Sequence, residues 1–260
     1  MARLYDIVDF LEKYLGVKNF ANVDIVINGL EVEGREEVKK AIFAVSLTRH
    51  IVNKAVEYGA DAIFLHHGIL TKGTRGAELP CNIIQGKFKE ILKTILAHDI
   101  SVFAYHLPLD AHPEIGNNVT IASLLGLKDI EWIPEDKCPP IGIVGILDPP
   151  MKVEEVLNIV KEKINPKAVL LNHGPEVIRR VAVVSGAGGD YVRRFRKGEI
   201  DLLVTGEVKE QHEVYAINEE INIIVAGHYH TEVFGIRNLS KLVKDRFSID
   251  TLFVESCQMV

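Results

Sequence analysis

The sequence predicts an α/β protein, and two observations support this fold class. Short apolar runs typical of buried strands alternate with longer segments whose apolar residues recur at the 3.6-residue period of a helix. Three of the apolar runs also end directly in histidines and acidic residues, within residues 62–67, 101–110 and 221–232. Because ligands of open α/β sheets gather at the carboxyl ends of the strands, these three strand ends predict one shared site.

The composition is that of an ordinary globular protein. The 260 residues are 47% hydrophobic and 25% charged, which suits one large domain or two smaller ones. The formal net charge of −6 gives no bulk signal for a nucleic-acid or membrane surface. No apolar run approaches the ~18 residues of a membrane span, and acidic residues interrupt the first segment, unlike a signal peptide. The 3 cysteines have no short spacing, so we expect reduced thiols in a cytoplasmic protein.

The first half of the chain predicts a β-α-β unit that leads to the paired histidines His66 and His67. Thr48 is placed to cap the start of the connecting helix, and Gly59 to end it. The two strands should be parallel, because a helix connects them. The expected elements are a helix over residues 3–15, an extended run over 24–30, a strand over 41–47, a loop over 71–82, a helix over 84–98, a strand ending at 106 and a helix over 115–125.

The middle of the chain predicts a second α/β segment. Residues 128–140 are polar and rich in proline, which favours a domain boundary there. Since ligand-bearing strand ends lie near both ends of the chain, we expect a discontinuous domain of residues 1–126 and 221–260, with residues 127–220 inserted as a second domain. The other expected elements are a strand over 141–147 ended by the prolines at 149 and 150, a helix over 153–164, strands over 168–171, 181–184 and 202–205, a helix over 232–246 and a strand over 252–254.

A glycine-rich loop, Ser185 to Asp190, precedes a basic segment that is expected to be helical. Amides at a helix start can hold an anion, but a simple turn explains the same glycines. The loop has neither the lysine of a P-loop nor the spacing of a dinucleotide fingerprint. Its role stays open between these two interpretations.

Histidine and carboxylate pairs predict a metal site. His228 and Glu232 are four residues apart, so both side chains share one face if a helix begins at the strand end. His106 and Asp110 have the same separation, but Pro108 argues against a continuous helix, and their convergence would depend on a fixed loop. An imidazole and a carboxylate placed together can hold one ion or bridge two.

Adjacent histidines point to a binuclear centre. His66 and His67 should point apart in an extended backbone, so each would serve a different ion. Nitrogen and oxygen ligands without thiolate fit two divalent ions of Zn, Fe, Mn, Ni or Co. The candidate metal ligands are His66, His67, Asp110, His228 and Glu232, with His106 as a further ligand or as a support for the others.

Two such ions would activate water for a displacement at phosphorus or carbon. Glu232, or a carboxylate near it, would manage the proton in that reaction. His212 follows Thr205-Gly206-Glu207 and could line the same cleft. The candidate catalytic residues are therefore Glu232, His106 and His212.

The motifs together resemble the Nif-three-like (Ngg-interacting-factor-three-like) family, whose members are also named GTP cyclohydrolase I type two homologues. The resemblance implies two α/β domains, a binuclear metal site in the cleft between them and a ring-shaped homohexamer. It implies the same five ligands by position, and His106 matches a family histidine at the site. The matching stretches include Asn28-Gly29-Leu30, His66-His67-Gly68, His106-Leu107-Pro108-Leu109-Asp110, Thr205-Gly206-Glu207, Gly227-His228 and Thr231-Glu232.

Three functions follow as alternatives. The favoured one is a metal-dependent hydrolase that acts on a nucleotide or another small phosphorylated or heterocyclic compound. The second is a non-enzymatic protein that binds or delivers metal, for which full coordination without an open water position would be the sign. The third is a ring that binds nucleic acid or protein, for which salt-dependent binding would be the sign; the acidic net charge argues against it.

Overall fold

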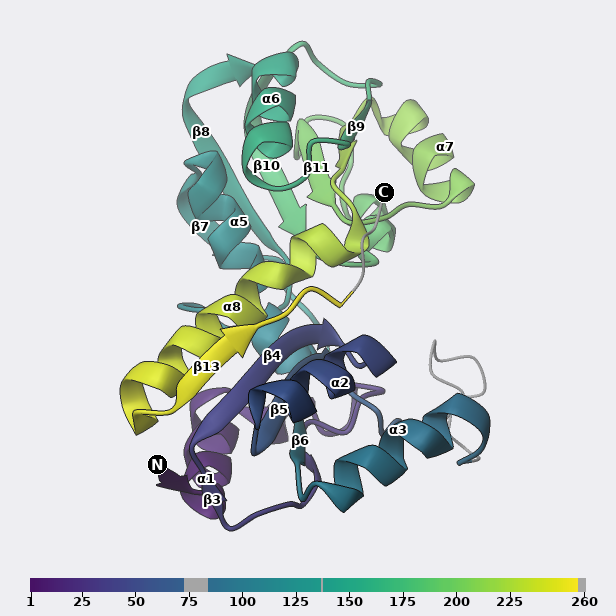
Figure 1. The fold of residues 1–260 in the computed structure, drawn as a ribbon. Helices are drawn as coiled ribbons and strands as arrows, with labels where there is room; N and C mark the ends of the chain where they lie inside the picture. Colours follow the sequence, from purple (N-terminus) through teal and green to yellow (C-terminus); the bar gives the residue numbers. More distant parts are fainter. Residues whose placement is uncertain (73–83, 137, 257–260) are drawn as a thin grey trace. The chain divides into compact units, whose positions relative to one another are not determined.

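The computed structural model describes residues 1–72, 84–136 and 138–256, and the chain divides into two compact units whose elements are labelled in Figure 1. Unit 1 comprises Met1–Leu109 and Gly235–Gln258, and unit 2 comprises Asp110–Phe234. Both units are mixtures of helices and sheets, so the α/β fold class is confirmed.

The division between the units differs from the predicted bounds of 1–126 with 221–260 and 127–220. Two elements expected in the first domain belong to unit 2 instead: α5 (Asn117–Leu125) packs in the core of unit 2 and β12 (Asn222–Val225) pairs with its neighbour there. The polar segment taken for a boundary begins with a strand, β7 (Lys128–Trp132), which pairs antiparallel with β8. A polar strand at a sheet edge resembles a linker in composition.

Unit 1 is built on a five-stranded sheet in the order β13-β4-β5-β6-β2. The first four of these strands are mutually parallel, and β2 runs antiparallel to β6. Because β13 pairs with β4, the last described strand of the chain completes the sheet that the first part began. The strands are β2 (Gly29–Val32), β4 (Lys40–Ser46), β5 (Ala62–His67), β6 (Ser101–Ala104) and β13 (Asp250–Phe253), with β1 (Ala2–Arg3) and β3 (Glu37–Val38) forming a separate pair.

Helix α2 (Arg49–Tyr58) of unit 1 has both predicted caps. The side chain of Thr48 accepts a hydrogen bond from Ile51 N at the start of α2, and Gly59 ends this helix with a φ of 68°. That left-handed conformation carries little cost for glycine. The helices are α1 (Leu4–Tyr14), the 3-10 helix η1 (Val17–Phe20), α2 (Arg49–Tyr58) and α3 (Gly86–Ala97).

The two faces of the unit 1 sheet are packed differently. On one face, α2 and α3 cover an aliphatic core that includes Ile42 and Ile63. On the other face, Phe43, Phe64 and Phe103 occupy paired positions of three neighbouring strands. Their rings stack with centroids 4.6 and 4.4 Å apart. This aromatic stack ties β4, β5 and β6 together in one register.

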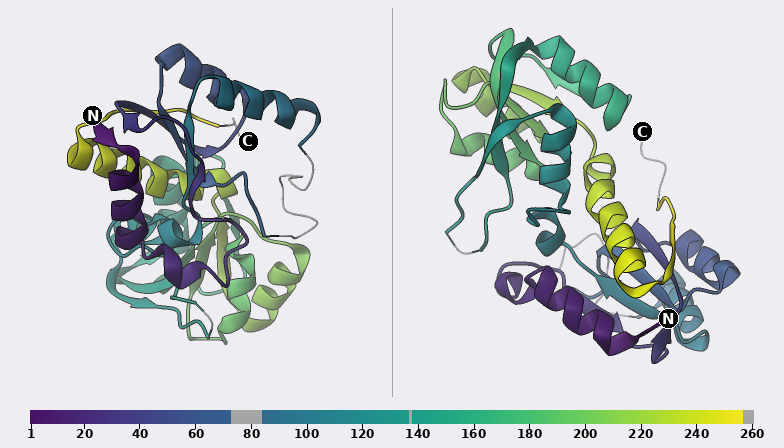
Figure 2. Two further views of the ribbon diagram at one scale, coloured as in Figure 1. Left: turned by 90° about the horizontal axis from the view of Figure 1, so that it is seen from below. Right: turned by 90° about the vertical axis from the view of Figure 1, so that its left-hand side faces the viewer.

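The end of the last helix also packs against the first helix of unit 1. Both views of Figure 2 show α1 beside the C-terminal part of α8 (His228–Phe247). The rings of Phe10 and Phe247 meet edge to face with centroids 5.5 Å apart. Helix α8 therefore begins in unit 2 and ends against α1 in unit 1.

Unit 2 is built on a six-stranded sheet in the order β7-β8-β10-β11-β12-β9. Strands β10, β11 and β12 are parallel, and the outer strands run antiparallel to their neighbours. Helices α5 and α6 pack on one face, and α7 with the 3-10 helix η2 packs on the other. The remaining elements are β8 (Ile143–Lys152), α6 (Val153–Lys163), β9 (Val169–Leu171), β10 (Val177–Val184), η2 (Gly188–Arg194), β11 (Leu202–Thr205) and α7 (Glu210–Glu219).

Proline misled the sequence analysis at two places. Strand β8 continues through Pro149 and Pro150 to Lys152. It can do so because it bulges there: Ile146 pairs with Arg180 and Met151 with Ile178, so the residues 147–150 lie opposite a single residue of β10, Arg179. Prolines are tolerated at such bulges, where the ladder needs no N–H donor. A one-turn helix, α4 (Leu107–Asp110), likewise contains Pro108. A first helical turn has N–H groups without intrahelical partners, so proline costs little there.

The expected extended run over residues 24–30 is confirmed in part, because Val26 forms an isolated antiparallel bridge with Thr71 ahead of β2. Val26 N and Asn28 Nδ2 both donate to the carboxylate of Asp24, and β2 begins only at Gly29. Most of the expected loop over residues 71–82 lies outside the described residues, as do Cys81 and Cys257. Cys138 is a free thiol.

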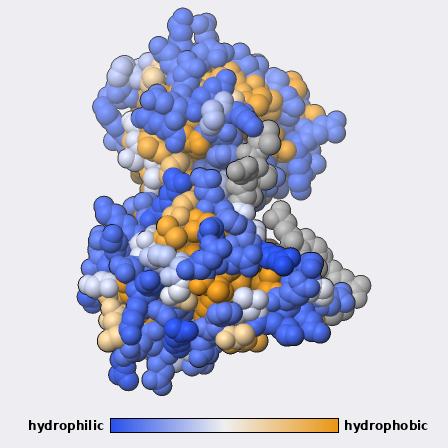
Figure 3. Space-filling model, in the orientation of Figure 1, coloured by the Kyte–Doolittle hydropathy of each residue, from blue (hydrophilic) through white to orange (hydrophobic). Residues whose placement is uncertain are grey.

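Among the described residues, no helix is both long enough and apolar enough to cross a membrane. On the face drawn in Figure 3, hydrophilic residues predominate and hydrophobic residues show between them in patches. Exposed apolar side chains such as Val169 and Val214 are usual on protein surfaces and need no partner.

Candidate metal centre

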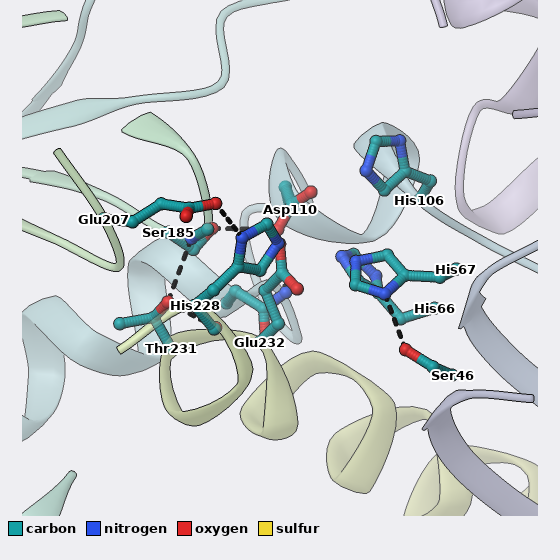
Figure 4. Close-up of polar contacts among 12 residues, drawn as sticks. Ser46, His66, His67, His106, Asp110, Ser185, Glu207, His228, Thr231 and Glu232 are labelled. Carbon is teal, nitrogen blue, oxygen red and sulfur yellow. Dashed lines mark hydrogen bonds and ion pairs between the residues drawn. The ribbon is translucent and has the colours of Figure 1, made fainter. Parts of the chain in front are cut away.

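The histidines of unit 1 stand where two parallel strands end (Figure 4). Strand β5 ends at His67, and β6 ends two residues before His106. Leu65 pairs with Ala104 across these strands, and Ser46 of β4 pairs with His67. The strand register therefore brings His66, His67 and His106 to one edge of the sheet.

Hydrogen bonds hold two of these rings through Nδ1. His66 is fully buried, and its Nδ1 lies 3.0 Å from the backbone oxygen of Tyr105. A carbonyl oxygen can only accept, so Nδ1 of His66 carries the hydrogen and Nε2 carries the lone pair. Nδ1 of His67 lies 2.8 Å from Oγ of Ser46. Nε2 is therefore the nitrogen through which either ring would ligate a metal.

The third ring is held by a carboxylate. Nδ1 of His106 lies 2.8 Å from Oδ1 of Asp24, which is buried. Burial raises the pKa of Asp24, but the hydrogen bond and charge of His106, with hydrogen bonds from Asn28 and Val26, bring this pKa below its usual value. Because an ionised carboxylate only accepts, His106 donates from Nδ1, and the neutral form of the ring carries its lone pair on Nε2.

These three histidines, called the histidine set below, converge. Their ligand atoms lie within 4.8 Å of one another, and the ring centroids of His66 and His67 are 5.0 Å apart. The expectation that His66 and His67 point apart is wrong for this reason. Strand β5 ends at His67, where the pleat no longer imposes opposite side-chain directions.

Unit 2 brings a second group of ligands to the ends of its parallel strands. Val184, Thr205 and Val225 are paired across β10, β11 and β12, so the residues that follow them emerge together. Helix α8 begins at His228, three residues after β12, which places Glu232 one turn further along the helix. The predicted arrangement on one helix face is confirmed by a distance of 3.1 Å between His228 Nε2 and Glu232 Oε1.

Asp110 joins His228 and Glu232 in what is called the acidic set below. The carboxylates of Asp110 and Glu232 are both buried, at 3% exposed, and each offers an oxygen within 4.8 Å of the other. Asp110 is fixed by two donors to its Oδ1, Asn117 Nδ2 at 2.8 Å and Ser185 Oγ at 2.9 Å. Two buried carboxylates this close attract a cation or a proton.

The carboxylates that contact His228 favour the charged form of its ring. Burial lowers the pKa of His228, but hydrogen bonds and charge from Glu232, and then from Glu207, outweigh it and raise this pKa to about 10. Glu207 contacts the Nδ1 atom and Glu232 the Nε2 atom of the ring. A metal at Nε2 would replace the proton there, because only a neutral imidazole nitrogen ligates metals.

Glycines allow the acidic set to pack closely. Gly186 has a φ of 59°, and a Cβ there would collide with Oε1 of Glu232. A Cβ on Gly206 would lie 2.5 Å from Gly186 O and 2.8 Å from the Cα of His228. Thr231 links the two segments, since its Oγ1 accepts a hydrogen bond from Gly186 N at 2.9 Å. The sequence Thr205-Gly206-Glu207 thus matters for its backbone as well as for Glu207.

The structure gives His212 a different role from the predicted one. Its Nδ1 accepts from Lys209 N at 3.1 Å, and its Nε2 lies 2.9 Å from Oδ1 of Asp190. Both ring nitrogens are thus used to fix the start of α7 against η2, which supports a structural role. In the glycine-rich loop, Ser185 N donates to Asn118 Oδ1 and Gly186 N to Thr231. These two amides hold the loop in unit 2 and are not turned to an anion.

Four residues that position the ligands were not predicted from the sequence. Asp24, Ser46 and Ser185 contact ligand side chains, and Glu207 contacts His228. Ser46 carried a usable signal, because it ends a strand that was expected to run parallel to the one ending at His67. Asp24 carried none, since the turn that contains it is far from His106 in sequence.

Comparison with known proteins gives a whole-chain family match. Residues 2–258 match the family described as Duf34/NIF3 (NGG1p interacting factor 3). A protein of Pyrococcus abyssi named "GTP cyclohydrolase 1 type 2 homolog" is 37% identical over 252 residues, covering 96% of this chain and 97% of the relative. A protein of the same name from Escherichia coli strain K12 is 36% identical over 233 residues, covering 89% of this chain and 90% of the relative.

Solved structures show the same fold. A protein titled "ybgI, unknown function" superimposes with a TM-score of 0.89 at 33% identity, over 100% of both chains. The crystal structure of TTHA1606 from Thermus thermophilus superimposes with a TM-score of 0.87 at 31% identity, also over 100% of both chains.

Proposed function

The chain belongs to the Duf34/NIF3 family, and we propose that it is a metal-dependent hydrolase whose histidine and acidic sets hold two divalent metal ions. The observation that carries this proposal is the convergence of the three imidazoles, whose ligand atoms lie within 4.8 Å of one another. In His66 and His106 a hydrogen bond holds Nδ1, so the neutral form of each ring presents its lone pair at Nε2. Lone pairs gathered in this way are stabilised by a shared cation.

The donor atoms fit a divalent transition metal. Imidazole nitrogens form the histidine set, and the acidic set adds two carboxylates and one further imidazole, with no thiolate among them. This chemistry suits Zn, Fe, Mn, Ni or Co. We further propose that the two sets belong to one binuclear centre, as expected from the sequence and from the family resemblance.

The proposed reaction is hydrolysis. Divalent metal ions polarise the bond to be broken and lower the pKa of water, so that a nucleophile forms at neutral pH. Within the chain, Glu232 is the carboxylate we propose to accept the proton of the attacking water, because it is buried at the start of α8 beside His228. Glu207 would hold the His228 ring by Nδ1.

The substrate class we propose is a nucleotide or another small phosphorylated or heterocyclic compound. Its support is the name "GTP cyclohydrolase 1 type 2 homolog" that relatives at 36–37% identity carry. Opening of a heterocycle by water and hydrolysis of a phosphoester need the same two elements, an activated water and a polarised electrophile.

Elemental analysis tests the metal part of the proposal. Protein purified without chelator or histidine tag should contain about two ions per chain, by the two-ion geometry described for hydrolases. His228→Ala and Glu232→Ala should each lower this content. His173→Ala is a matched control, because His173 bonds Glu213 of α7 and belongs to neither ligand set. Absence of metal after supply of Zn, Mn, Fe, Co and Ni would contradict the proposal.

An activity screen tests the enzymatic part. The metal-loaded protein should hydrolyse at least one compound in a panel of nucleoside triphosphates, nucleotides and phosphoesters, and Glu232→Gln should abolish that activity. If the protein holds two ions firmly and hydrolyses no compound of the panel, the result would instead support a role in metal storage or delivery.

A further inference from the structure

Asp24 is bonded on all sides although it lies outside both ligand sets. Its Oδ1 accepts from Val26 N at 2.9 Å and from His106 Nδ1 at 2.8 Å. Its Oδ2 accepts from Asn28 Nδ2 at 2.8 Å and from Leu107 N at 3.0 Å. The side chain is 1% exposed. A carboxylate can be buried in this way only because every lone-pair direction faces a donor.

These hydrogen bonds connect residues 24–28 to the segment that begins at His106. Asp24 holds the ring of His106, and Asn28 holds the backbone of His106, because its Oδ1 accepts from His106 N at 2.7 Å. The same carboxylate holds Leu107 N, the start of α4. His106 is thereby fixed in tautomer, ring orientation and backbone position. The first residue of the Asn28-Gly29-Leu30 motif therefore has a structural role, because Asn28 bonds both Asp24 and the backbone of His106.

We infer that Asp24 is a positioning residue that makes His106 a metal ligand through Nε2, an inference that rests on the proposed metal-dependent function. A hydrogen bond from the distal nitrogen of a ligating histidine to a carboxylate fixes the ring and strengthens the metal bond. His106 also meets the other ligands: its ring centroid is 5.1 Å from that of His66 and 5.8 Å from that of His67.

An alternative role for the same pair is proton transfer. A carboxylate that orients a histidine also serves general bases, whose Nε2 takes a proton from the nucleophile. The convergence of the His106 ligand atom with those of His66 and His67 within 4.8 Å favours ligation, because a base needs no cluster of other imidazoles. The two roles differ in a measurable way, since a base can be weakened without changing metal affinity.

The test measures metal affinity in the full chain. Co²⁺ and Zn²⁺ are titrated into metal-free wild-type protein and the Asp24→Asn variant against a competing chelator, and the visible absorption of bound Co²⁺ is recorded. We expect roughly 10- to 100-fold weaker binding of one ion in Asp24→Asn, the range typical of lost carboxylate support, with an altered Co²⁺ spectrum. His106→Ala should weaken the same ion, and Asp24→Asn should add little in that background.

Asp61→Asn is the matched control. Asp61 is also buried in unit 1, at 6% exposed, and also accepts from two backbone N–H groups, those of Lys39 and Lys40. Its remaining partner is Arg35 rather than a histidine. The control therefore creates a similar buried defect without touching a ligand, and its metal affinity should stay close to that of the wild type.

The outcomes separate this inference from the proposed function. Wild-type protein that binds none of Co²⁺, Zn²⁺, Mn²⁺, Fe²⁺ and Ni²⁺ overturns both. If the wild type binds two ions, and folded Asp24→Asn binds them with the same affinity and the same Co²⁺ spectrum, only the role of Asp24 is overturned. If Asp24→Asn does not fold, His106→Ala decides alone: unchanged affinity for both ions shows that His106 is not a ligand and overturns the inference.

Discussion

The two ligand sets are prepared for metal in different ways. In unit 1, parallel strands in register carry the histidines to a sheet edge, and hydrogen bonds to Tyr105 O, Ser46 and Asp24 fix each ring. In unit 2, close backbone packing positions the ligands, because Gly186 and Gly206 let their loops approach the first turn of α8. Each ring of the histidine set is fixed by a hydrogen bond to Nδ1. The acidic set has side-chain partners too, at Asp110 and His228, and needs in addition a close approach of backbone that only glycine allows.

The difference extends to charge. The histidine set has one buried carboxylate behind it, Asp24, and its ligand atoms are all imidazole nitrogens. The acidic set contains two buried carboxylates and a histidine whose pKa is raised to about 10 because Glu232 and Glu207 outweigh its burial. Substitutions should therefore damage the histidine set by removing a partner of a ring, and the acidic set by disturbing its charge or its close packing.

The largest effect is expected from breaking the strand register beneath the histidine set. Phe64 lies fully buried in the aromatic stack between Phe43 and Phe103. Phe64→Ala should lower the free energy of unfolding by about 3–5 kcal/mol, because it removes a large buried ring and leaves a cavity. Denaturant unfolding measures this loss, and metal content should fall with it.

Phe88→Ala is the control for this prediction. Phe88 is only partly buried on α3, outside the stack, so the same change of residue type should cost less. Equal losses in the two variants would show that the stack has no special part in holding the register.

The stability of the protein is expected to depend on pH through Glu31, which holds the segment that follows His66 and His67. Glu31 accepts hydrogen bonds from Ile69 N and Leu70 N, and its burial raises its pKa from 4.5 to about 7. Because the folded pKa is the higher one, the favourable contribution is fully present below pH 4.5 and is lost as pH rises to about 7. The change should be about 3 kcal/mol.

Unfolding of the wild type and of Glu31→Gln, measured from pH 4.5 to 7.5, checks this prediction. The wild type should lose stability relative to the variant as pH rises, since glutamine does not ionise. Glu37→Gln, a change at an exposed residue of β3, should leave the profile of the wild type intact. In unit 2 the neutral Thr231 accepts the hydrogen bond from Gly186 N, so this loop contact itself should not depend on pH. A flat difference between the wild type and Glu31→Gln would contradict the raised pKa.

Local sequence patterns predicted much of the framework. The helix from Thr48 to Gly59 was predicted with both of its caps, because capping depends on residues within one turn. The spacing of His228 and Glu232 predicted their shared helix face for the same reason. The family was also recognised from motifs, which keep their order along the chain.

Contacts between distant segments could not be predicted in this way. Asp24 and His106 are 82 residues apart, and no local pattern in a turn shows which side chain it will meet. The convergence of His66 and His67 depends on where β5 ends, and strand ends are poorly defined by apolar runs. Pro149 and Pro150 were taken as a strand end because the bulge that accommodates them depends on the pairing with β10.

A smaller effect is expected from adding one methyl group to the acidic set. Gly186→Ala would place a Cβ against Oε1 of Glu232, so the loop or the first turn of α8 must shift. We expect a loss of about 1–3 kcal/mol in unfolding free energy and a lower metal content by elemental analysis. Gly198→Ala is the control, since Gly198 also has a positive φ, 84°, but a Cβ added there would meet no atom within 4 Å. Similar metal loss in both variants would show that strain, not the collision, is responsible.

The smallest effect is expected from the two hydroxyl groups that support the sets. Ser46→Ala removes the partner of His67 Nδ1 and should cost only about 1 kcal/mol of stability, while weakening metal binding through a ring that is no longer fixed. Thr231→Val removes the acceptor for Gly186 N and should lower stability more than Ser46→Ala does, because it leaves a buried backbone donor without its partner. Metal affinity and thermal unfolding, measured on both variants, compare the loss of a partner for a ligand ring with the loss of a partner for the backbone. If Ser46→Ala lost stability and kept its metal affinity, the strand register alone would orient the histidine set, and the two units would support their ligands in the same way.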